Sequence, residues 1–295
     1  MNDFPLWTAI VTPMKTNGKV DYKSFEKIIR RQEEAGNGVL VLGSTGEGLN
    51  LTSEEKREVV SFATNRDLEV PVMAGIGGFE LSAQIEFMNF CDAAEVDAML
   101  LVTPLYAKPG PEGQYAWFSE LLAETNTPCM LYNVPSRTGV KMDPTVPGRL
   151  VNEFDNLMGV KEASGSVEEF KMFREEAPEL SFYSGDDGMT PAFTAEGAVG
   201  LVSVASNVWP EETHKYVELC LKGETERVLP VWKEASAALF RAPNPIPAKV
   251  LLQKKGWIES DTVRLPLSLS DINADTEAEL SAAEEKISSW YSTNK

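Results

Sequence analysis

Short apolar runs alternate with stretches of helical period along most of the chain. The runs are rich in β-branched and other apolar residues, as is typical of strands buried on both faces of a parallel sheet. Eight such runs lie at residues 7–13, 38–44, 70–76, 98–104, 128–134, 157–163, 181–187 and 200–206. The pattern therefore predicts a parallel β-sheet whose strands are connected by helices.

The segments between these runs carry helix start signals. The sequences TSEE at residues 52–55 and SVEE at 166–169 fit the capping box, in which a hydroxyl and a carboxylate satisfy free backbone N–H groups. Regular repetition of strand and helix favours a (β/α)8 TIM barrel over an open doubly wound sheet, whose repeats are less regular. The predicted fold class is thus α/β, with a barrel.

Strand signals stop after about residue 225. Segments 224–240 and 276–292 both have a helical pattern, and the proline-rich stretch RAPNPIPAK at 241–249 separates the first of them from the segment that follows. We therefore predict a catalytic barrel over residues 1–224 and a C-terminal helical domain over 225–295.

Composition limits the partners of the chain. Its 295 residues are 43% hydrophobic, which is ample for a large core, and its net charge of −18 makes nucleic acid an unfavourable partner. Residues 1–13 lack a positively charged leader segment, and no apolar stretch approaches the roughly 18 residues of a membrane span. We expect a soluble cytoplasmic protein with neither a nucleic-acid nor a membrane partner.

The chain is poor in the residues of common catalytic sites. Cys91, Cys129 and Cys220 are far apart in apolar surroundings, which is typical of reduced structural thiols. The single histidine, His214, lies in a helix-like stretch and is expected to be structural. Because Ser-His-Asp, Cys-His and histidine-based metal sites need imidazoles, any chemistry must rest on Lys, Tyr, Ser, Thr, Arg or carboxylates.

Polar residues follow the predicted strands at one end. In (β/α)8 barrels the active site lies at the C-terminal ends of the strands. The segments found there are GSTGEG (43–48), TPLYAKP (103–109), YNVPSRTG (132–139), KEASG (161–165), SGDDG (184–188) and SVASN (203–207). We therefore expect reactive side chains to gather at this face.

Lys161 is the most conspicuous of these residues because it lies inside a predicted buried strand. An ion pair with Glu162 is awkward, since neighbours in a strand point to opposite faces. A strand-end lysine whose ammonium reaches solvent is an alternative. The gathering of polar residues at the same face favours a functional lysine.

Other segments at this face have both structural and functional interpretations. GSTGEG offers backbone N–H groups to an anion but lacks the lysine of a Walker A loop, so a tight turn is the alternative. GIGG at 75–78 is interpreted as a turn at the barrel rim. Asp186 and Asp187 are interpreted as turn formers, because a divalent metal would need a third clustered ligand. We therefore predict no metal.

Three further residues are ambiguous when considered alone. Tyr106 and Tyr132 are typical amphipathic aromatics, and Arg137 could be an ordinary surface charge. At the mouth of a barrel that holds a reactive amine, however, a guanidinium is a natural bidentate partner for a substrate carboxylate.

Taken in order, the segments GSTGEG, YNVPSRTG, KEASG, SGDD and PNPIP resemble those of the dihydrodipicolinate synthase family, which belongs to the pyruvate-dependent aldolase superfamily with N-acetylneuraminate lyase. The resemblance covers nearly the whole chain and implies a (β/α)8 barrel with a C-terminal helical domain. It further implies condensation of pyruvate with L-aspartate 4-semialdehyde to 4-hydroxy-tetrahydrodipicolinate, in lysine and diaminopimelate biosynthesis. No cofactor is expected.

The resemblance also assigns roles to residues. Lys161 would be the Schiff-base lysine. Tyr132, Ser44 and a Tyr106 from the neighbouring subunit would form a hydroxyl relay for protons, so a homo-oligomer is expected, either a dimer or a tetramer of two tight dimers. Ser44 departs from the usual threonine and loses the methyl group that restricts its rotamer.

Three further residues would bind the substrates. The backbone of Ser44 and Thr45 would hold the pyruvate carboxylate, the carbonyl of Val202 would line the pyruvate pocket, and Arg137 would bind the carboxylate of the second substrate. An alternative is a pyruvate-releasing lyase acting on a sialic acid or a 2-keto-3-deoxy sugar acid, which Ser44 favours slightly and Arg137 opposes. A barrel that binds a keto acid without turnover is the more remote alternative.

The resemblance also bears on regulation. Lysine-inhibited relatives bind lysine through polar side chains at the tight-dimer interface, and the matching positions here are Ser53, Lys56, Phe79, Ala83 and Leu105. A missing carboxylate at Ala83 and an added charge at Lys56 leave the ammonium groups of lysine poorly compensated. We predict that the enzyme is insensitive to L-lysine.

Overall fold

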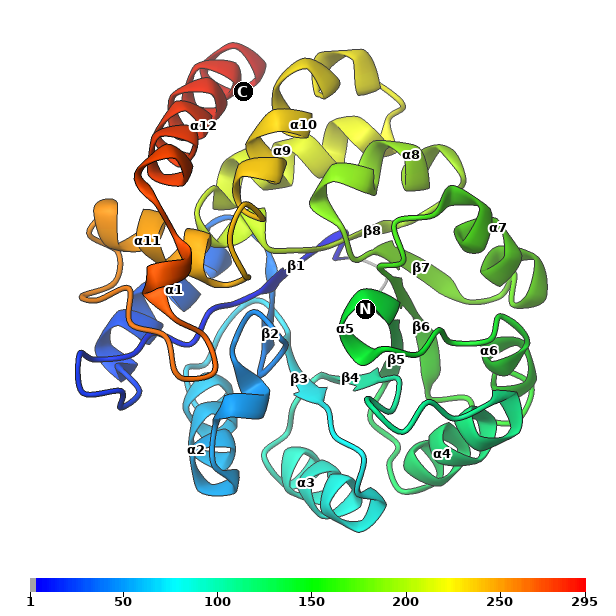
Figure 1. The fold of residues 1–295 in the computed structure, drawn as a ribbon. Helices are drawn as coiled ribbons and strands as arrows, with labels where there is room; N and C mark the ends of the chain where they lie inside the picture. Colours follow the sequence, from blue (N-terminus) through cyan, green and yellow to red (C-terminus); the bar gives the residue numbers. More distant parts are fainter. Residues whose placement is uncertain (1–3) are drawn as a thin grey trace.

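The computed structural model describes residues 4–295 and contains a closed barrel of parallel strands. Each strand pairs with the next along the chain, and β8 closes onto β1 (Figure 1). The strands are β1 (Leu6–Ala9), β2 (Gly38–Val41), β3 (Val72–Ile76), β4 (Ala98–Val102), β5 (Cys129–Asn133), β6 (Leu157–Glu162), β7 (Ser181–Ser184) and β8 (Gly200–Ser203). The predicted (β/α)8 barrel is confirmed.

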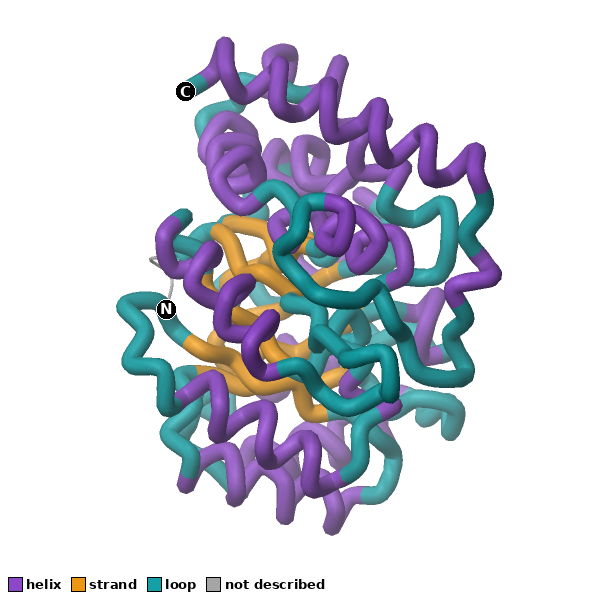
Figure 2. The backbone as a smooth tube through the Cα atoms, turned by 90° about the vertical axis from the view of Figure 1, so that its left-hand side faces the viewer, coloured by secondary structure: helices purple, strands orange, loops and turns teal. Residues whose placement is uncertain are grey.

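Helices form the layer outside the strands, as Figures 1 and 2 both show. They are α1 (Tyr22–Glu34), α2 (Ser53–Thr64), α3 (Leu81–Ala93), α4 (Pro111–Ala123), α6 (Thr145–Leu150), α7 (Val167–Glu176), α8 (Thr190–Ala195) and α9 (Pro210–Leu221). The short helix α5 (Pro135–Thr138) lies instead over the end of the barrel (Figure 1). The capping box predicted at Thr52 and Glu55 is present. At α7 only half of it forms, because Ser166 caps the helix while Glu169 pairs with Lys141 at 2.8 Å.

Several predicted apolar runs extend beyond the observed strands at their C-terminal ends. The run 38–44 contains β2 only as far as Val41, because Leu42 has a left-handed φ of 61° and turns the chain. Gly75 permits this turn, since a Cβ there would lie 2.8 Å from the Leu42 carbonyl oxygen. The first two residues of the GIGG segment, Gly75 and Ile76, lie inside β3. The prediction of a rim turn over the whole segment is therefore wrong.

Two apolar clusters stabilise the fold. The larger one fills the space between the strands and the outer helices. The smaller one fills the barrel interior and includes Trp7, Leu40, Met73, Met130 and Tyr183. Because large side chains occupy the interior, the barrel is a packed core rather than a channel, and a ligand must bind at its end.

The C-terminal region is mainly helical, with turns and irregular backbone over residues 255–268. Its helices are α10 (Leu229–Ala238), α11 (Ile246–Lys254) and α12 (Ala274–Asn294), the last of which ends at the C-terminus at the top of Figure 2. α12 packs against α10, where the rings of Trp232 and Trp290 lie nearly perpendicular with centroids 5.4 Å apart. The domain boundary at residues 224 and 225 stays a prediction.

The single histidine and the three cysteines lie where they contribute to the packing of the fold. His214 Nδ1 lies 2.8 Å from Asn37 Oδ1, which ties α9 to the segment before β2. Cys91, Cys129 and Cys220 are buried and free. Among residues 4–295, no helix is both long and apolar enough to cross a membrane; of the N-terminal segment considered above, residues 1–3 lie outside the described part.

Candidate active site

Lys161 lies on β6 and its side chain enters the barrel interior. The register places it opposite Tyr132 of β5, and its Nζ lies 4.3 Å from the centroid of the Tyr132 ring. The next residue, Glu162, points to the other face of the strand and accepts hydrogen bonds from Asn133 Nδ2 and the Ser164 N–H, both at 2.6 Å. Alternation along the strand thus separates Lys161 from Glu162, as expected.

The surroundings of Lys161 change its protonation. Only 5% of the residue is exposed, and this burial lowers the pKa of its ammonium group to about 7. The nearby negative charge of Asp187 raises this pKa, while the positive charge of Arg137 lowers it. A substantial share of Lys161 is therefore a neutral amine near pH 7, which is the nucleophilic form.

Gly185, directly after β7, makes room for the lysine side chain. A Cβ at this position would lie 2.9 Å from Lys161 Cε and 2.7 Å from Ala163 Cβ. Any larger residue would therefore displace the lysine or the backbone beside it.

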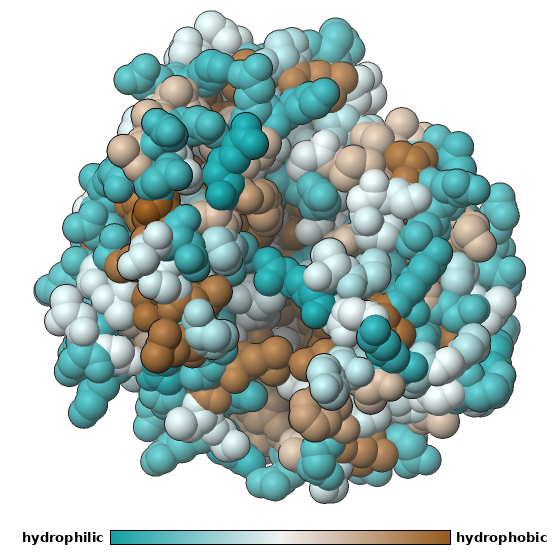
Figure 3. All heavy atoms as spheres, in the orientation of Figure 1, coloured by the Kyte–Doolittle hydropathy of each residue, from teal (hydrophilic) through white to brown (hydrophobic). Residues whose placement is uncertain are grey.

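A cavity opens at the C-terminal ends of the strands and is lined in part by Ser44, Tyr132 and Arg137. Figure 3, in the orientation of Figure 1, shows the surface hollowed over the centre of the barrel. Burial raises the pKa of the Tyr132 phenol to about 12, against the effects of Arg137 and of a side-chain interaction with Ser44. Tyr132 therefore stays a protonated hydroxyl that can exchange hydrogen bonds with Ser44.

Arg137 lies on the short helix α5, at the mouth of this cavity. Within residues 4–295, no carboxylate pairs with its guanidinium and its side chain donates no hydrogen bond. A cation without a partner beside a cavity is suited to bind an anionic ligand.

The loop after β2 carries the other anion-binding candidates. Thr45 is 2% exposed, and its Oγ1 accepts a hydrogen bond from Asn244 Nδ2 at 2.9 Å. Among the hydrogen bonds of the described residues, none is donated by the backbone N–H of Ser44 or Thr45. Val202 of β8 is buried in the same interior cluster as Tyr132. These residues lie at the same end of the barrel as Lys161.

Tyr106 is the one predicted relay residue that the chain does not bring to its own cavity. It is 87% exposed, has a left-handed φ of 66°, and its backbone N–H donates to the Thr138 carbonyl at 3.0 Å. Its phenol therefore lies on the outside of this subunit.

Sequence reasoning missed Asp187. Asp186 is a turn former, with Oδ1 accepting from the Gly188 N–H at 2.9 Å. Asp187, in contrast, is buried and its carboxylate accepts from Ser203 Oγ at 2.5 Å and from the Val204 N–H at 3.0 Å. Burial raises the pKa of this carboxyl to about 6. The signal available in the sequence was the acidic pair directly after one strand, beside the polar end of the next.

Together these groups favour a reaction between the amine of Lys161 and the carbonyl group of a ligand. A neutral buried lysine, a protonated phenol beside it, unused backbone N–H groups and an unpaired guanidinium can bind a keto acid and move its protons. Across residues 4–295, no three His, Cys, Asp or Glu side chains come together as they would around a metal ion.

Comparison with known proteins agrees with this interpretation of the site. The chain is 46% identical over 288 residues to the 4-hydroxy-tetrahydrodipicolinate synthase of Francisella tularensis subsp. novicida (strain U112), covering 97% of each chain. It is 44% identical over 290 residues, with the same coverage, to the protein of that name from Francisella philomiragia subsp. philomiragia.

A solved structure is similar over almost the whole fold. The 4-hydroxy-tetrahydrodipicolinate synthase of Methylacidiphilum fumariolicum SolV superposes with a TM-score of 0.93 at 33% identity, covering 98% of this chain and 97% of that one. The sequence profile of the Dihydrodipicolinate synthetase family matches residues 5–285. The chain therefore belongs to the dihydrodipicolinate synthetase family.

Proposed function

We propose that this protein condenses pyruvate with L-aspartate 4-semialdehyde to form 4-hydroxy-tetrahydrodipicolinate, a step of lysine and diaminopimelate biosynthesis. Family membership supports the reaction. The single observation that carries the mechanism is Lys161, a buried lysine whose pKa of about 7 leaves it partly neutral at the mouth of a packed barrel.

In the first half of the reaction, the Lys161 amine attacks C2 of pyruvate. The keto oxygen leaves as water and a C=N bond forms between C2 and Nζ. The cationic nitrogen then accepts the electron pair that is left when C3 loses a proton, which gives an enamine. No metal or organic cofactor is needed, because the imine itself is the electron sink.

In the second half, C3 of the enamine attacks the aldehyde carbon of aspartate semialdehyde and the aldehyde oxygen takes up a proton. The amine of that substrate then attacks C2, the bond from C2 to Lys161 breaks, and a six-membered ring closes. Lys161 returns to a free amine.

Tyr132 and Ser44 carry the protons in this proposal, together with the partner's Tyr106. The support for the first pair is their position on one cavity and the interaction of Ser44 with the Tyr132 phenol. A hydroxyl relay is chemically reasonable here because each member both donates and accepts. Serine in place of the usual threonine holds this relay less rigidly.

Carboxylate groups select the substrates. The unused N–H groups of Ser44 and Thr45 receive the carboxylate of pyruvate, and Val202 contributes its carbonyl to the pocket wall. The unpaired guanidinium of Arg137 receives the carboxylate of aspartate semialdehyde. Removal of that guanidinium should therefore impair the second substrate more than the first.

The exposed position of Tyr106 supports a homo-oligomer. A phenol that is 87% exposed contributes nothing to the cavity of its own chain, but it can enter that of a second copy. We infer a tight dimer, either alone or paired into a tetramer, that works in the cytoplasm.

The competing reaction is the release of pyruvate from a sialic acid or a 2-keto-3-deoxy sugar acid. It would use the same lysine, so Lys161 does not separate the two. Arg137 separates the two reactions. An unpaired cation at the mouth of the cavity suits the carboxylate of aspartate semialdehyde better than the neutral hydroxyl groups of a sugar chain.

A turnover assay with three arms tests the proposal. Purified protein is given pyruvate with aspartate semialdehyde, N-acetylneuraminate alone, or pyruvate alone with binding measured by calorimetry. We expect turnover in the first arm only. Faster turnover in the second arm, or binding in the third without turnover in either, would replace the proposal with the lyase or with the keto-acid-binding barrel.

A further inference from the structure

The loop after β2, which carries Ser44 and Thr45, is tightly wound. Leu42 and Glu47 both have left-handed φ angles, 61° and 53°, which non-glycine residues adopt only where the surroundings hold them. A Cβ on Gly48 would lie 2.1 Å from the Leu42 carbonyl oxygen, so the two ends of the loop are in contact. Two hydrogen bonds within the loop, from the Glu47 N–H to the Ser44 carbonyl and from the Gly48 N–H to the Gly43 carbonyl, are both 3.2 Å long, and contacts from outside the loop add to them.

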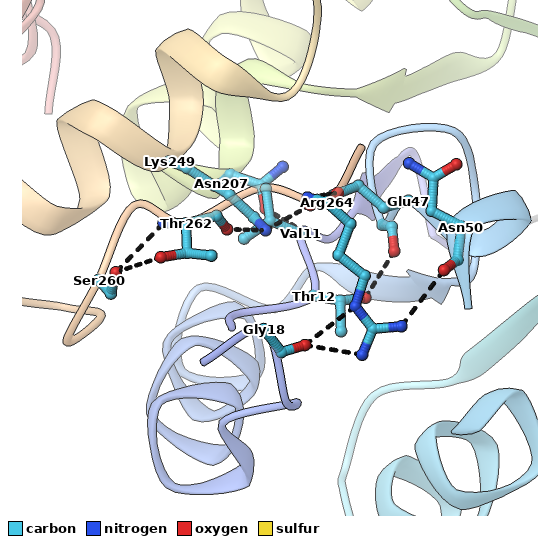
Figure 4. A network of polar contacts seen from close by, with 11 residues as sticks. Val11, Thr12, Gly18, Glu47, Asn50, Asn207, Lys249, Ser260, Thr262 and Arg264 are labelled. Atoms are coloured by element: carbon cyan, nitrogen blue, oxygen red, sulfur yellow. Dashed lines mark hydrogen bonds and ion pairs between the residues drawn. The ribbon is translucent and has the colours of Figure 1, made fainter. Parts of the chain in front are cut away.

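The strongest of these contacts is a buried ion pair between Glu47 and Lys249 of α11. Both side chains have 0% exposure, and Lys249 Nζ donates to Glu47 Oε1. The ammonium group also donates to the Thr262 carbonyl at 2.9 Å, and the second carboxylate oxygen of Glu47 accepts from the Arg264 N–H at 2.9 Å. Figure 4 shows Lys249 and Arg264 approaching Glu47 from the C-terminal region.

Arg264 also binds the residues that follow the loop, up to the first turn of α2. Its guanidinium donates to Glu55 at 2.5 and 2.7 Å and to the Asn50 carbonyl at 3.2 Å. It also donates to the Gly18 carbonyl at 2.7 and 2.9 Å (Figure 4). The chain from Glu47 to Glu55 is thus held at both ends by one C-terminal segment.

A third connection from this segment reaches the substrate-binding residue itself. Asn244 Nδ2 donates to Thr45 Oγ1 at 2.9 Å, and both residues are buried. Between them, Gly46 is held from another side, because its carbonyl accepts from Thr12 Oγ1 at 2.7 Å. Residues 45, 46 and 47 are therefore each fixed by a group outside the loop, while the N–H groups of Ser44 and Thr45 remain unused.

Stability alone gives a weak reason for such a pair. Desolvation makes a buried ion pair costly, and apolar residues of similar volume are often equally stable in its place. A buried pair with all its hydrogen bonds made does, however, specify one conformation of the groups that it joins. Here that conformation is the one that directs two backbone N–H groups to the end of the barrel.

We propose that Glu47, Lys249 and Asn244 are positioning residues that hold the N–H groups of Ser44 and Thr45 in the geometry that binds the carboxylate of pyruvate. The C-terminal segment from 244 to 264 thereby determines pyruvate affinity although it lies outside the barrel sheet. This inference rests on the proposed function and adds a structural requirement to it.

The test compares Lys249→Met with Lys255→Met by steady-state kinetics and thermal unfolding. Lys255 is the matched control, because it comes from the same segment and pairs with Glu284 at 2.6 Å, but the pair is away from the loop. We expect Lys249→Met to raise the KM for pyruvate at least about tenfold, since displacement of a binding group by about 1 Å can cost on the order of 100-fold. The KM for aspartate semialdehyde should stay within about twofold of wild type, and Lys255→Met should change neither.

Two further variants separate positioning from stability. Glu47→Gln combined with Lys249→Met leaves no buried charge, so Tm should recover relative to Lys249→Met while the pyruvate KM stays raised. Recovery of both together would show a merely structural pair and overturn the proposal. Asn244→Ala removes only the bond to Thr45 and should raise the pyruvate KM even if Lys249→Met does not fold; an unchanged KM in this variant would overturn the proposal as well.

The wild-type protein separates this inference from the proposed function. If it forms no borohydride-trapped adduct with pyruvate, the proposed function and this inference both fail. If it forms the adduct and the Lys249 and Asn244 variants have wild-type pyruvate kinetics, the proposed function stands and the positioning role is wrong.

Discussion

At the scale of single residues, burial governs the chemistry of Lys161. The same desolvation that makes a lysine unfavourable in a strand lowers its pKa to about 7 and so supplies a neutral amine. Asp187 opposes this effect by its negative charge, from a carboxylate that also holds the end of β8 through Ser203 and the Val204 N–H. The reactivity of the lysine is therefore set by its burial and by charged residues that follow the ends of β7 and β5.

This balance predicts a pH dependence. Because only the neutral amine attacks, the rate of imine formation with pyruvate should rise as pH increases through about 7 and then level off. Asp187→Asn removes a charge that raises the Lys161 pKa, so the rising limb should move to lower pH. Stopped-flow measurement of imine formation from pH 5.5 to 9 is the check; a limb that moves upward, or stays in place, contradicts this assignment.

Arg137 gives a second prediction at this scale. Arg137→Ala should still form the pyruvate adduct but lose roughly 30- to 150-fold in kcat/KM for aspartate semialdehyde, because a charge-assisted bidentate contact is worth about 2 to 3 kcal/mol. Arg149→Ala is the control, since Arg149 pairs with Glu112 on the exposed surface. Wild-type kinetics in Arg137→Ala would refute its role and favour the sugar-acid lyase.

At the scale of elements, the barrel could be predicted from the sequence and the ends of its strands could not. Apolar runs identify strands because burial on both faces leaves few polar positions. The turn at Leu42 follows from contact with Gly75 on the neighbouring strand, which no local pattern reveals. For the same reason Asp187 was interpreted as a turn former, although its hydrogen bonds are to β8. The pairing of Glu47 with Lys249 cannot be seen in the sequence either, because the two residues are 202 positions apart.

The end of β7 gives a prediction at this scale. Gly185→Ala should strongly reduce the formation of the pyruvate adduct, because the new methyl group would lie 2.9 Å from Lys161 Cε. Gly110→Ala is the matched control, since nothing lies within 4 Å of a Cβ there. Both variants are compared by borohydride trapping and Tm. Equal adduct formation in the two variants would show that the lysine side chain does not need a glycine at position 185.

At the scale of the whole molecule, one predicted site residue lies apart from the others. Lys161, Tyr132, Ser44 and Arg137 gather at one end of the barrel, whereas Tyr106 faces outward. The sequence alone suggested this only through its family resemblance, because residue patterns do not report which surfaces meet in an assembly. The proposed contribution of a partner's Tyr106 and the predicted insensitivity to L-lysine both concern the surface around this cavity.

Regulation at that surface can be tested directly. Ser53, Lys56, Ala83 and Leu105 line the cavity, whereas Phe79 is an exposed aromatic outside its lining. The described part of the chain provides no ion-pair partner for Lys56, so its charge would repel the ammonium groups of lysine. We expect no inhibition by L-lysine at millimolar concentrations and no binding heat in calorimetry. Saturable inhibition accompanied by heat would show that this interpretation of the surface is wrong.

The central claim is that Lys161 forms the imine with pyruvate, and borohydride trapping tests it most directly. The protein is incubated with pyruvate and borohydride, digested, and the modified peptide is identified by mass spectrometry. We expect one adduct per chain, on the peptide that contains Lys161, and none in Lys161→Ala or in Lys161→Arg, whose guanidinium stays protonated. Labelling of a different lysine, or undiminished labelling in Lys161→Ala, would contradict it.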